Sequence, residues 1–228
     1  MTSKNRWEEF AQQDAEFYIL TNVDDESAGD RLERFYASGQ ESVDHLLGVV
    51  GDALQSHGRA LEIGCGMGRI SFPMSKHFEQ LVGVDIAPTM IEKLKANAAS
   101  MGFENVEGAL AGDAWDAPQS LDFAYSWLVF QHIEDWDVIA GYIERLGEAI
   151  RPGGIACLQF DTRPENLAYR IRPFVPSALL PRTWKTGIRR IRRSVPLLME
   201  SFERCGFELV AEDGQGGIEH IFVLRRRV

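Results

Sequence analysis

The chain has 228 residues, 45% of them hydrophobic and 25% charged, and a formal net charge of −10. This length suffices for one well-buried globular domain and is short for two. The acidic balance argues against a surface built as a whole to bind nucleic acid. We therefore expect no DNA partner, and RNA stays open only for one basic segment described below.

The cysteines and the N-terminal sequence bear on the cellular compartment. Cys65, Cys157 and Cys205 are widely spaced and form no CxxC pair. This usage fits a reducing compartment and predicts neither a disulfide framework nor a zinc site. The sequence begins MTSKNRWEEFAQQDAEF, without the apolar segment of a secretory signal, and no stretch approaches the length of a membrane span. We therefore expect a soluble, cytoplasmic protein of unknown oligomeric state.

Residues 1–57 are predicted to form an N-terminal helical cap. They end in the amphipathic run ESVDHLLGVVGDAL. Six aromatic residues precede this run: Trp7, Phe10, Phe17, Tyr18, Phe35 and Tyr36. Tyr18 and Tyr36 are candidates to cover a neighbouring cleft, but packing within the cap is the simpler interpretation of each.

Strand-like and helix-like runs alternate over residues 58–162. The strand-like runs are 58–64, 80–85, 104–113, 120–130 and 155–160, and the helix-like runs are 68–78, 87–102 and 135–154. Pro88 suits a first helical turn and Gly102 a helix end, while Pro152 and Gly153 are expected to close the last helix. Such alternation predicts a parallel sheet covered on both faces, with ligands at the carboxyl ends of the strands.

Residues 163–196 form an insertion after the fifth predicted strand. Within 163–193, nine Lys or Arg residues stand against one acid, Glu165, which gives a local charge of +8. The simplest interpretation is a solvated basic surface. Arginine mixed with large apolar side chains also suits a lid over an anionic or lipid-like acceptor, and, ranked behind it, contact with an anionic membrane surface.

The two halves of this insertion differ in their content of proline. Prolines at 164, 173, 176 and 181 argue against one long helix through the first half. The second half is predicted to be helical from about Arg182 to Ser194. Its basic face is expected to carry Arg189, Arg190, Arg192 and Arg193.

Residues 197–228 are predicted to form a helix followed by two antiparallel strands. The runs CGFELV and HIFVLRR are strand-like, and a Gly-rich turn separates them. Two strands joined so tightly must be antiparallel, because a parallel pair needs a long crossover.

Three glycines follow the first strand-like run, in ALEIGCGMGRI: Gly64, Gly66 and Gly68. A GxGxG turn between a strand and a helix lets main-chain N–H groups approach the polar end of a ligand. Alone the pattern is weak, because dinucleotide enzymes use the related GxGxxG. A tight turn with close helix packing is the alternative, and it explains one glycine better than three. The acid Glu62 stands two residues before the first glycine.

Two carboxylates follow later strand-like runs. Asp85 ends the second run, where a carboxylate can accept hydrogen bonds from both hydroxyls of a ribose, and a role at the start of the next helix is compatible with that. Asp113, in the sequence LAGDAW, can accept from an adenine amino group while the N–H of Ala114 meets a ring nitrogen. For Asp113 alone, a polar loop residue is an equally good interpretation.

Together these segments resemble the class I S-adenosylmethionine-dependent methyltransferases. The matching segments are LEIGCGMG, VGVDIAPTMI, AGDA, LDFAYSWLVFQHIED, AIRPGG and the two C-terminal strand-like runs. The resemblance covers residues 40–162 well and 197–228 moderately. It implies an α/β fold: a Rossmann-like doubly wound sheet of about seven strands, the last antiparallel, with the N-terminal cap and a lid insertion after the fifth strand.

The resemblance also implies the cofactor, S-adenosylmethionine, and the residues around it. Gly64, Gly66 and Gly68 would surround the methionine moiety, with Glu62 organising their loop. Asp85 would bind the ribose, and Ile86, Asp113 and Ala114 the adenine, while Trp127 would line the floor beside the sulfonium. The product would be S-adenosylhomocysteine. The rival interpretations are an NAD-linked oxidoreductase, an aminopropyl transferase and a non-catalytic cofactor-binding subunit.

The acceptor is predicted to be a small molecule methylated on oxygen or nitrogen. His132, in FQHIED, is the best candidate for a general base because its ordinary pKa lies near neutrality, although a bracing role for it is equally compatible. Asp161 and His220 are weaker candidates. The position of the DPPY-type motif of amino-methylating enzymes reads YSWL, which disfavours DNA adenine and peptide glutamine. No Asp/Asn cluster suggests a magnesium site, so we expect no metal.

Overall fold

The computed structural model describes residues 7–9, 11–12, 28–113, 115, 117–171, 175 and 190–228. Its strands are β1 (Arg59–Ile63), β2 (Gln80–Asp85), β3 (Val106–Leu110), β4 (Leu121–Ser126), β5 (Ile150–Phe160), β6 (Phe207–Asp213) and β7 (His220–Arg226). Its helices are α2 (Ala28–Val50), α3 (Ser71–Ser75), α4 (Pro88–Met101), α5 (Trp136–Ala149), α6 (Leu167–Ile171) and α8 (Val195–Arg204), with the 3-10 turns η1 (Gly51–Ala53) and η2 (Phe130–His132).

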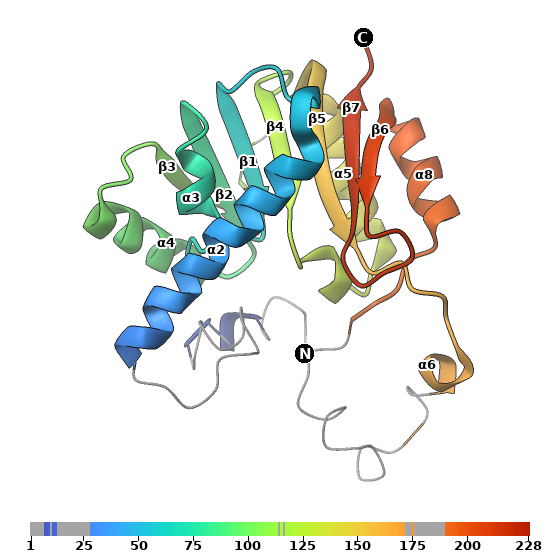
Figure 1. Cartoon of the computed structure of the whole chain (residues 1–228), viewed down its shortest axis with the longest axis horizontal. Coiled ribbons are helices and arrows are strands. Elements are labelled where there is room, and N and C mark those ends of the chain that lie inside the picture. Colours follow the sequence, from blue (N-terminus) through green and yellow to red (C-terminus); the bar gives the residue numbers. More distant parts are fainter. Residues whose placement is uncertain are drawn as a thin grey trace.

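These strands form one seven-stranded sheet in the order β3-β2-β1-β4-β5-β7-β6 (Figure 1). The strands β1 to β5 pair in parallel, and β7 pairs antiparallel with both β5 and β6. The predicted doubly wound sheet with an antiparallel end is therefore confirmed. Between β1 and β4 the order of the strands reverses, and ligands of open α/β sheets bind at the carboxyl ends beside such a switch point.

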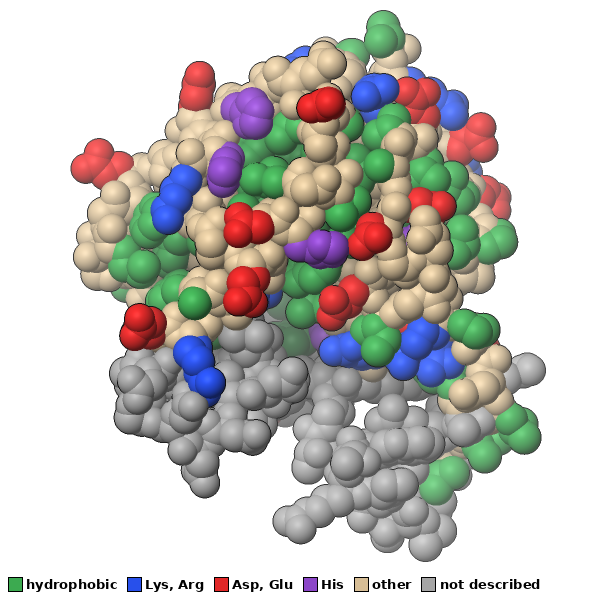
Figure 2. Space-filling view, viewed as in Figure 1, with side chains coloured by type: hydrophobic (Ala, Val, Ile, Leu, Met, Phe, Trp, Pro, Cys, Tyr) green, Lys and Arg blue, Asp and Glu red, His purple; other side chains and the backbone are tan. Residues whose placement is uncertain are grey.

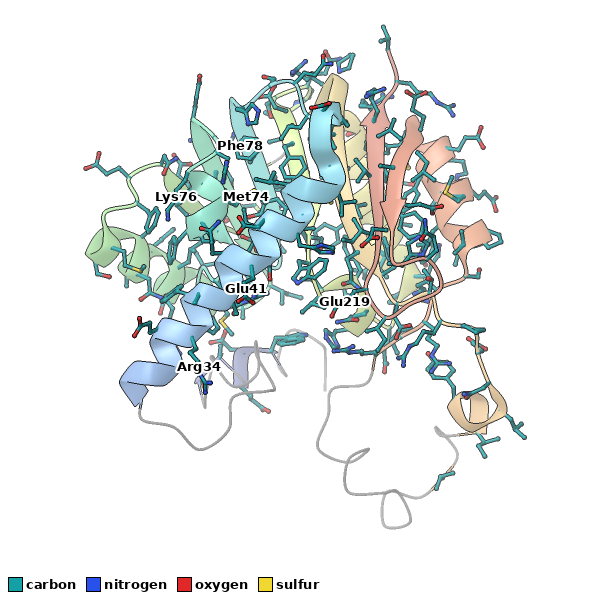
Figure 3. The ribbon with its side chains drawn as sticks, in the orientation of Figure 1. Arg34, Glu41, Met74, Lys76, Phe78 and Glu219 are labelled. Carbon is teal, nitrogen blue, oxygen red and sulfur yellow. The ribbon has the colours of Figure 1, made fainter. Side chains whose placement is uncertain are left out.

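Alternate residues of each strand enter two separate cores. Ala60 and Phe123 pack beneath α2, α3 and α4, whereas Leu61 and Ala124 pack beneath α5 and α8. This follows from the two-residue repeat of a strand, because a sheet covered on both faces buries both sets of side chains. In Figure 1, α2 crosses one face of the sheet diagonally, from the side of α3 and α4 toward β7 and β6. Figure 3 places Arg34 and Glu41 along this helix.

Local sequence explains where the helices of the core begin and end. Pro88 is the first residue of α4, and Gly102 ends it in the left-handed region, with a φ of 78° and an N–H that donates to the carbonyl of Ala98. Asp135 caps α5 by accepting from the N–H of Asp137 at 3.0 Å. Each device satisfies main-chain groups that the end of a helix leaves without an intrahelical partner.

Two predicted helix boundaries are wrong. The helix expected over 68–78 is only the short α3, and α5 ends at Ala149, so that Pro152 and Gly153 lie within β5 instead of closing the helix. The N–H of Ile150 still donates to Leu146, but its ψ of 127° already belongs to the strand. The chain therefore passes directly from helix to strand. The separate turn that Pro152 and Gly153 had suggested is not formed.

The basic insertion contains less helix than expected among its described residues. Residues 190–194 are not helical: the N–H of Ile191 donates to Gln131 O and that of Arg193 to Asp161 O, so neither joins an intrahelical ladder. The helix predicted up to Ser194 is therefore wrong over these residues, and positions 182–189 lie outside the described residues. No helix in the described part of the chain is long and apolar enough to cross a membrane.

Candidate functional site

The glycine loop turns sharply at the carboxyl end of β1. Gly64, Gly66 and Gly68 all have positive φ, at 80°, 52° and 104°. A Cβ at Gly64 would lie 2.2 Å from Val129 Cγ2, and one at Gly68 would lie 2.4 Å from Phe72 Cζ. Packing of the protein itself thus requires two of the three glycines, a larger share than the sequence suggested.

Asp85 joins the end of β2 to this loop. Its Oδ2 accepts from the N–H of Gly66 at 3.0 Å, and its Oδ1 accepts from the N–H of Ala87 at 2.9 Å. Burial raises the pKa of this carboxyl above its ordinary value, and the N–H donors, among them Ala87 and Gly66, oppose that rise. A carboxylate has about four acceptor positions, so two main-chain bonds leave room for a ligand hydroxyl.

Glu62 lies beneath the glycine loop and is 3% exposed. Its Oε2 accepts from Ser71 Oγ at 2.5 Å and from Tyr125 Oη at 2.9 Å. Burial raises its pKa from 4.5 to about 7, against the effects of these two hydroxyls and of Arg69. Glu62 therefore anchors the first residue of α3, which directly follows the loop, to β4.

Arg69 connects the glycine loop to α2, a role that sequence reasoning did not assign. Its buried guanidinium donates through Nη1 to Ser38 O at 3.2 Å and to Ser42 Oγ at 3.1 Å. A Cβ at Gly39 would lie 1.9 Å from Arg69 O, which shows how closely the helix meets the loop. Burial lowers the pKa of Arg69, and the acids Glu62 and Glu219 oppose this.

The residues predicted to border the adenine lie around the ends of β2 and β3. Ile86 is 37% exposed directly after Asp85. The carboxylate of the exposed Asp113 accepts from the N–H of Leu110 at 2.9 Å, so it already closes its own turn. This bond fits the polar-loop interpretation of Asp113, and its contact with an adenine stays a prediction. Ala114 lies outside the described residues.

A strained turn follows β4 beside the glycine loop. Trp127 is buried with its ring 6.0 Å from that of His45, and Leu128 has a φ of 60°. The N–H of Leu128 donates to Gln159 Oε1 at 2.9 Å, and Gln159 Nε2 donates to Ile218 O at 2.8 Å. A left-handed leucine is costly and persists only where the surroundings enforce it. Gln159 supplies that enforcement, and no sequence signal pointed to it.

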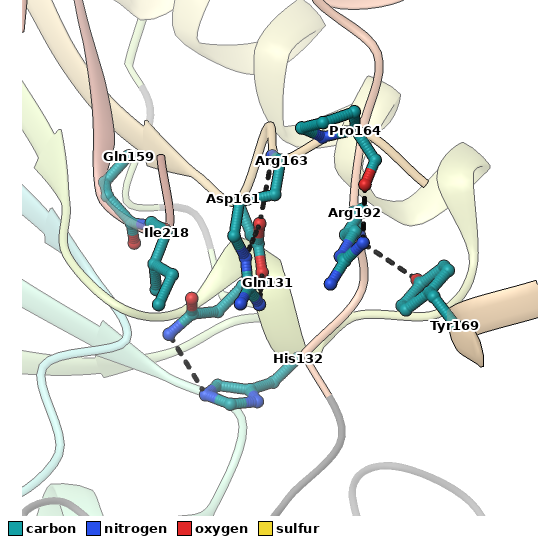
Figure 4. Close-up of polar contacts among 9 residues, drawn as sticks. All are labelled: Gln131, His132, Gln159, Asp161, Arg163, Pro164, Tyr169, Arg192 and Ile218. Carbon is teal, nitrogen blue, oxygen red and sulfur yellow. Dashed lines mark hydrogen bonds and ion pairs between the residues drawn. The ribbon is translucent and has the colours of Figure 1, made fainter. Parts of the chain in front are cut away.

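His132 ends η2, the 3-10 turn that follows β4 along the chain. Its Nε2 lies 3.4 Å from Nε2 of the buried Gln131 (Figure 4), and its ring is 5.8 Å from that of Trp7. The N-terminal segment thus reaches this end of the sheet through Trp7.

The same N-terminal residues also reach α4. Glu8 accepts from Thr89 Oγ1 at 2.5 Å, and Lys93 Nζ donates to the carbonyl of the fully buried Ala11 at 2.7 Å. Residues 7–9 and 11–12 therefore link the start of α4 to η2 across the carboxyl ends of the parallel strands.

The two weaker base candidates are both engaged elsewhere. Asp161 is fully buried and accepts from Arg163 Nη2 at 2.7 Å and Nε at 3.0 Å. His220, 1% exposed, has Nδ1 2.8 Å from Thr162 Oγ1 and Nε2 3.1 Å from Glu212 Oε2. Each side chain has its hydrogen-bonding atoms directed at protein groups, and the role of general base stays a prediction for His132.

Comparison with known proteins adds to this geometry. Residues 60–154 match the family described as methyltransferase domain. A ubiquinone biosynthesis O-methyltransferase of Mesorhizobium japonicum is 34% identical over 98 residues, which is 42% of this chain and 38% of that protein. A trans-aconitate 2-methyltransferase of Methylobacterium radiotolerans is 25% identical over 131 residues, 57% of this chain and 46% of that protein. The chain thus spans less than half the length of these curated relatives.

Solved structures share the fold at lower identity. A methyltransferase from Methanosarcina mazei has a TM-score of 0.63 at 20% identity, covering 78% of this chain and 96% of that one. Magnesium protoporphyrin IX methyltransferase from Synechocystis, with bound S-adenosylhomocysteine, has a TM-score of 0.65 at 15% identity, covering 98% and 100%. The cyclase SpnF has a TM-score of 0.62 at 16% identity, covering 83% of this chain and 82% of that one.

Proposed function

We propose that this chain, which carries a methyltransferase domain over residues 60–154 and has the class I methyltransferase fold, transfers a methyl group from S-adenosylmethionine to an oxygen or nitrogen of a small molecule. The observation that carries the proposal is the hydrogen bond from the Gly66 N–H to Asp85. It brings the glycine loop and the acid of the neighbouring strand together at the switch point of the sheet, where such folds bind nucleosides.

The residues present fit this cofactor. Asp85 keeps acceptor capacity for ribose hydroxyls, and Ile86 beside it exposes an apolar surface on which an adenine can pack. Asp113 and Ala114 would border the adenine, and Gly64 and the rest of its loop the methionine end. Trp127 would lie beside the sulfonium, with Glu62 holding the loop from below. Bound S-adenosylmethionine would supply an electrophilic methyl group.

The protein then mainly has to align the acceptor and exclude water. Residues 7–9 and 11–12 lie at the carboxyl ends of the strands, where Glu8 contacts Thr89 and Trp7 contacts His132. His132 would accept a proton if the acceptor arrives protonated. The names of the relatives, a ubiquinone biosynthesis O-methyltransferase and a trans-aconitate 2-methyltransferase, favour a small-molecule acceptor and oxygen as the methylated atom.

The same proposal divides the chain into one domain with four parts. Residues 1–57 are the N-terminal cap, 58–162 the cofactor-binding core, 163–196 the basic insertion and 197–228 the C-terminal helix and strand pair. The cysteines of the structure, Cys65, Cys157 and Cys205, are free, which favours a cytoplasmic location.

Calorimetric titration with S-adenosylmethionine, S-adenosylhomocysteine and NAD tests the proposal. We expect binding of both sulfur ligands and none of NAD. Tight NAD binding without a response to S-adenosylhomocysteine would contradict the assignment. Because the fold also occurs in a cyclase, transfer of a labelled methyl group is the second readout. Binding without transfer to any component of a metabolite extract would favour a non-catalytic cofactor-binding subunit.

A further inference from the structure

The end of the basic insertion crosses the carboxyl ends of β4 and β5. Ile191 is 9% exposed, and its N–H donates to Gln131 O at 2.6 Å. The N–H of Arg193 donates to Asp161 O at 2.9 Å, and Arg192 forms a parallel bridge with Asp161. These bonds fix residues 190–193 between the residue preceding His132 and the end of β5.

Two of the three guanidinium groups of this segment, those of Arg192 and Arg193, have only uncharged hydrogen-bond partners among the described residues. Arg192 Nη1 donates to Pro164 O at 2.6 Å, and its guanidinium lies 4.3 Å from the ring centre of Tyr169 (Figure 4). Arg193 Nη2 donates to Ile133 O at 2.9 Å and to Glu134 O at 2.8 Å. Within the described residues, neither arginine forms an ion pair.

Two acids near Arg192 and Arg193, Asp161 and Asp135, already accept hydrogen bonds from other groups. Asp161 pairs with Arg163 through two hydrogen bonds, at 3.0 and 2.7 Å. Asp135, which acts electrostatically on Arg193, caps α5 through the N–H of Asp137. Figure 2 shows Lys and Arg side chains gathered at this edge of the molecule, below the C-terminal strands and beside α6. Arg192 and Arg193 therefore present two positive charges that form no ion pair with a described residue.

Each of these arginines also keeps a donor without a partner. The Nε–H groups of Arg192 and Arg193 are buried and have no hydrogen-bond partner among the described residues. Buried donors in folded proteins are ordinarily satisfied. A guanidinium fork matches the oxygens of a carboxylate or phosphate, and such charge-assisted bonds are the strong ones. The rings of Tyr169 and Trp136, the latter 5.6 Å from Arg193, flank the charges with apolar surface.

We propose that Arg192 and Arg193 form a binding subsite for an anionic oxygen group of the acceptor, a carboxylate or a phosphate. The inference rests on the proposed methyltransferase function and adds the chemical class of its substrate. Arg193 holds the carbonyls of the two residues that follow His132. The subsite therefore secures the charged end of the acceptor while its nucleophilic atom faces the base and the cofactor.

Three probes that differ in their charged group test this subsite: benzoate, phenyl phosphate and benzamide. Each is titrated calorimetrically into the protein saturated with S-adenosylhomocysteine. We expect benzoate or phenyl phosphate to bind at least about tenfold more tightly than the neutral benzamide, as for a hydrogen bond to a charged group. The better of the two anions identifies a carboxylate or a phosphate as the group recognised. Added salt should weaken anion binding.

Variants assign the preference to the two arginines. Arg192→Gln and Arg193→Gln should each weaken anion binding at least about tenfold, and the corresponding Lys variants less, since they keep the charge. Arg227→Gln is the matched control. This variant loses the same charge at the opposite end of the strands, beside the start of β5. There Arg227 pairs with Glu203 at 3.7 Å.

Several outcomes would overturn the subsite. They are equal binding of benzamide and both anions, no binding of either anion, or unchanged anion binding in both Gln variants. If the Gln variants fail to fold, the wild type alone tests the subsite. Its preference for an anion over benzamide and the salt dependence of that binding are then the readouts. Binding of S-adenosylhomocysteine reports on the proposed function separately. If the wild type binds S-adenosylhomocysteine but does not prefer anions, the anion subsite is contradicted and the proposed methyltransferase function is not.

Discussion

The carboxyl ends of β1 and β2 differ from those of β4 and β5 in how they are held together. At β1 and β2, the carboxylate of Asp85 accepts from the main-chain N–H groups of Gly66 and Ala87. At β4 and β5, long side chains such as Gln159 and Arg193 reach carbonyls far away in the sequence. The first construction suits a ligand that stays the same across many proteins. The second permits a different acceptor in each, because side chains change without disturbing the sheet.

The largest effect is expected at the acceptor end. If His132 removes the proton of the acceptor, His132→Ala should lower kcat by about 10²–10⁴ and leave the affinity for S-adenosylhomocysteine unchanged. Single-turnover transfer of labelled methyl groups measures this, with Arg227→Gln as the control. An unchanged rate would return His132 to a bracing role beside Gln131 and would indicate an acceptor that arrives deprotonated.

Gly64→Val attacks the first construction through sterics. The new Cβ would fall 2.2 Å from Val129 Cγ2 at a φ of 80°, so we expect a loss of roughly 2–4 kcal/mol in the free energy of unfolding. Chemical denaturation measures it, together with the affinity for S-adenosylhomocysteine. Gly112→Ala is the control, because a Cβ there meets nothing within 4 Å. Equal stability of both variants would contradict the packing described at the loop.

Asp85→Ala tests the first construction through hydrogen bonding. Each charge-assisted bond is worth roughly 1.5–3 kcal/mol, so affinity for S-adenosylhomocysteine should fall at least about tenfold. Asp85→Asn should lose less, because its carbonyl oxygen still accepts from one N–H. Normal affinity in both variants would place the cofactor elsewhere. A partial loss of stability is also expected, since the carboxylate holds Gly66 and Ala87.

A further effect concerns the pH dependence of stability. The pKa of Glu62 is raised from 4.5 to about 7 in the folded protein, so the folded state binds the proton more tightly than the unfolded state. Stability from this group is complete below about pH 4.5 and is lost as the pH rises through 7, by up to roughly 3 kcal/mol.

Glu62→Gln removes that titration. Unfolding curves of the variant and the wild type between pH 5 and 8 give the comparison. Relative to the wild type, the variant should gain stability steadily as the pH rises. A difference that stays constant across this range would show that Glu62 does not titrate there.

The sequence predicted features that depend on neighbouring residues and missed those that depend on residues far away in the chain. Asp85 ends β2 at the expected residue and Gly102 ends α4, because both follow from short-range rules of strands and helix ends. The roles of Arg69 and Gln159 were not predictable, since their partners Ser38 and Ile218 lie 31 and 59 residues away. No local pattern encodes such pairs.

Residues 190–194 show how tertiary contacts override local preference. Their Arg-rich sequence predicts a helix, yet Ile191 and Arg193 give their N–H groups to Gln131 and Asp161. Hydrogen bonds to neighbouring strands and turns replaced those of a helix. The likeness to a known family covered residues 40–162 well, and the insertion was left to charge and proline content alone.

Titration of three proteins with S-adenosylhomocysteine tests whether the cofactor site lies at β1 and β2 and is independent of the acceptor end. The proteins are the wild type, Asp85→Ala and the double variant Arg192→Gln/Arg193→Gln. We expect the wild type and the double variant to bind with equal affinity and Asp85→Ala to bind at least about tenfold more weakly. Failure of the wild type to bind, or a loss confined to the double variant, would contradict a cofactor site built at β1 and β2 and independent of the acceptor end.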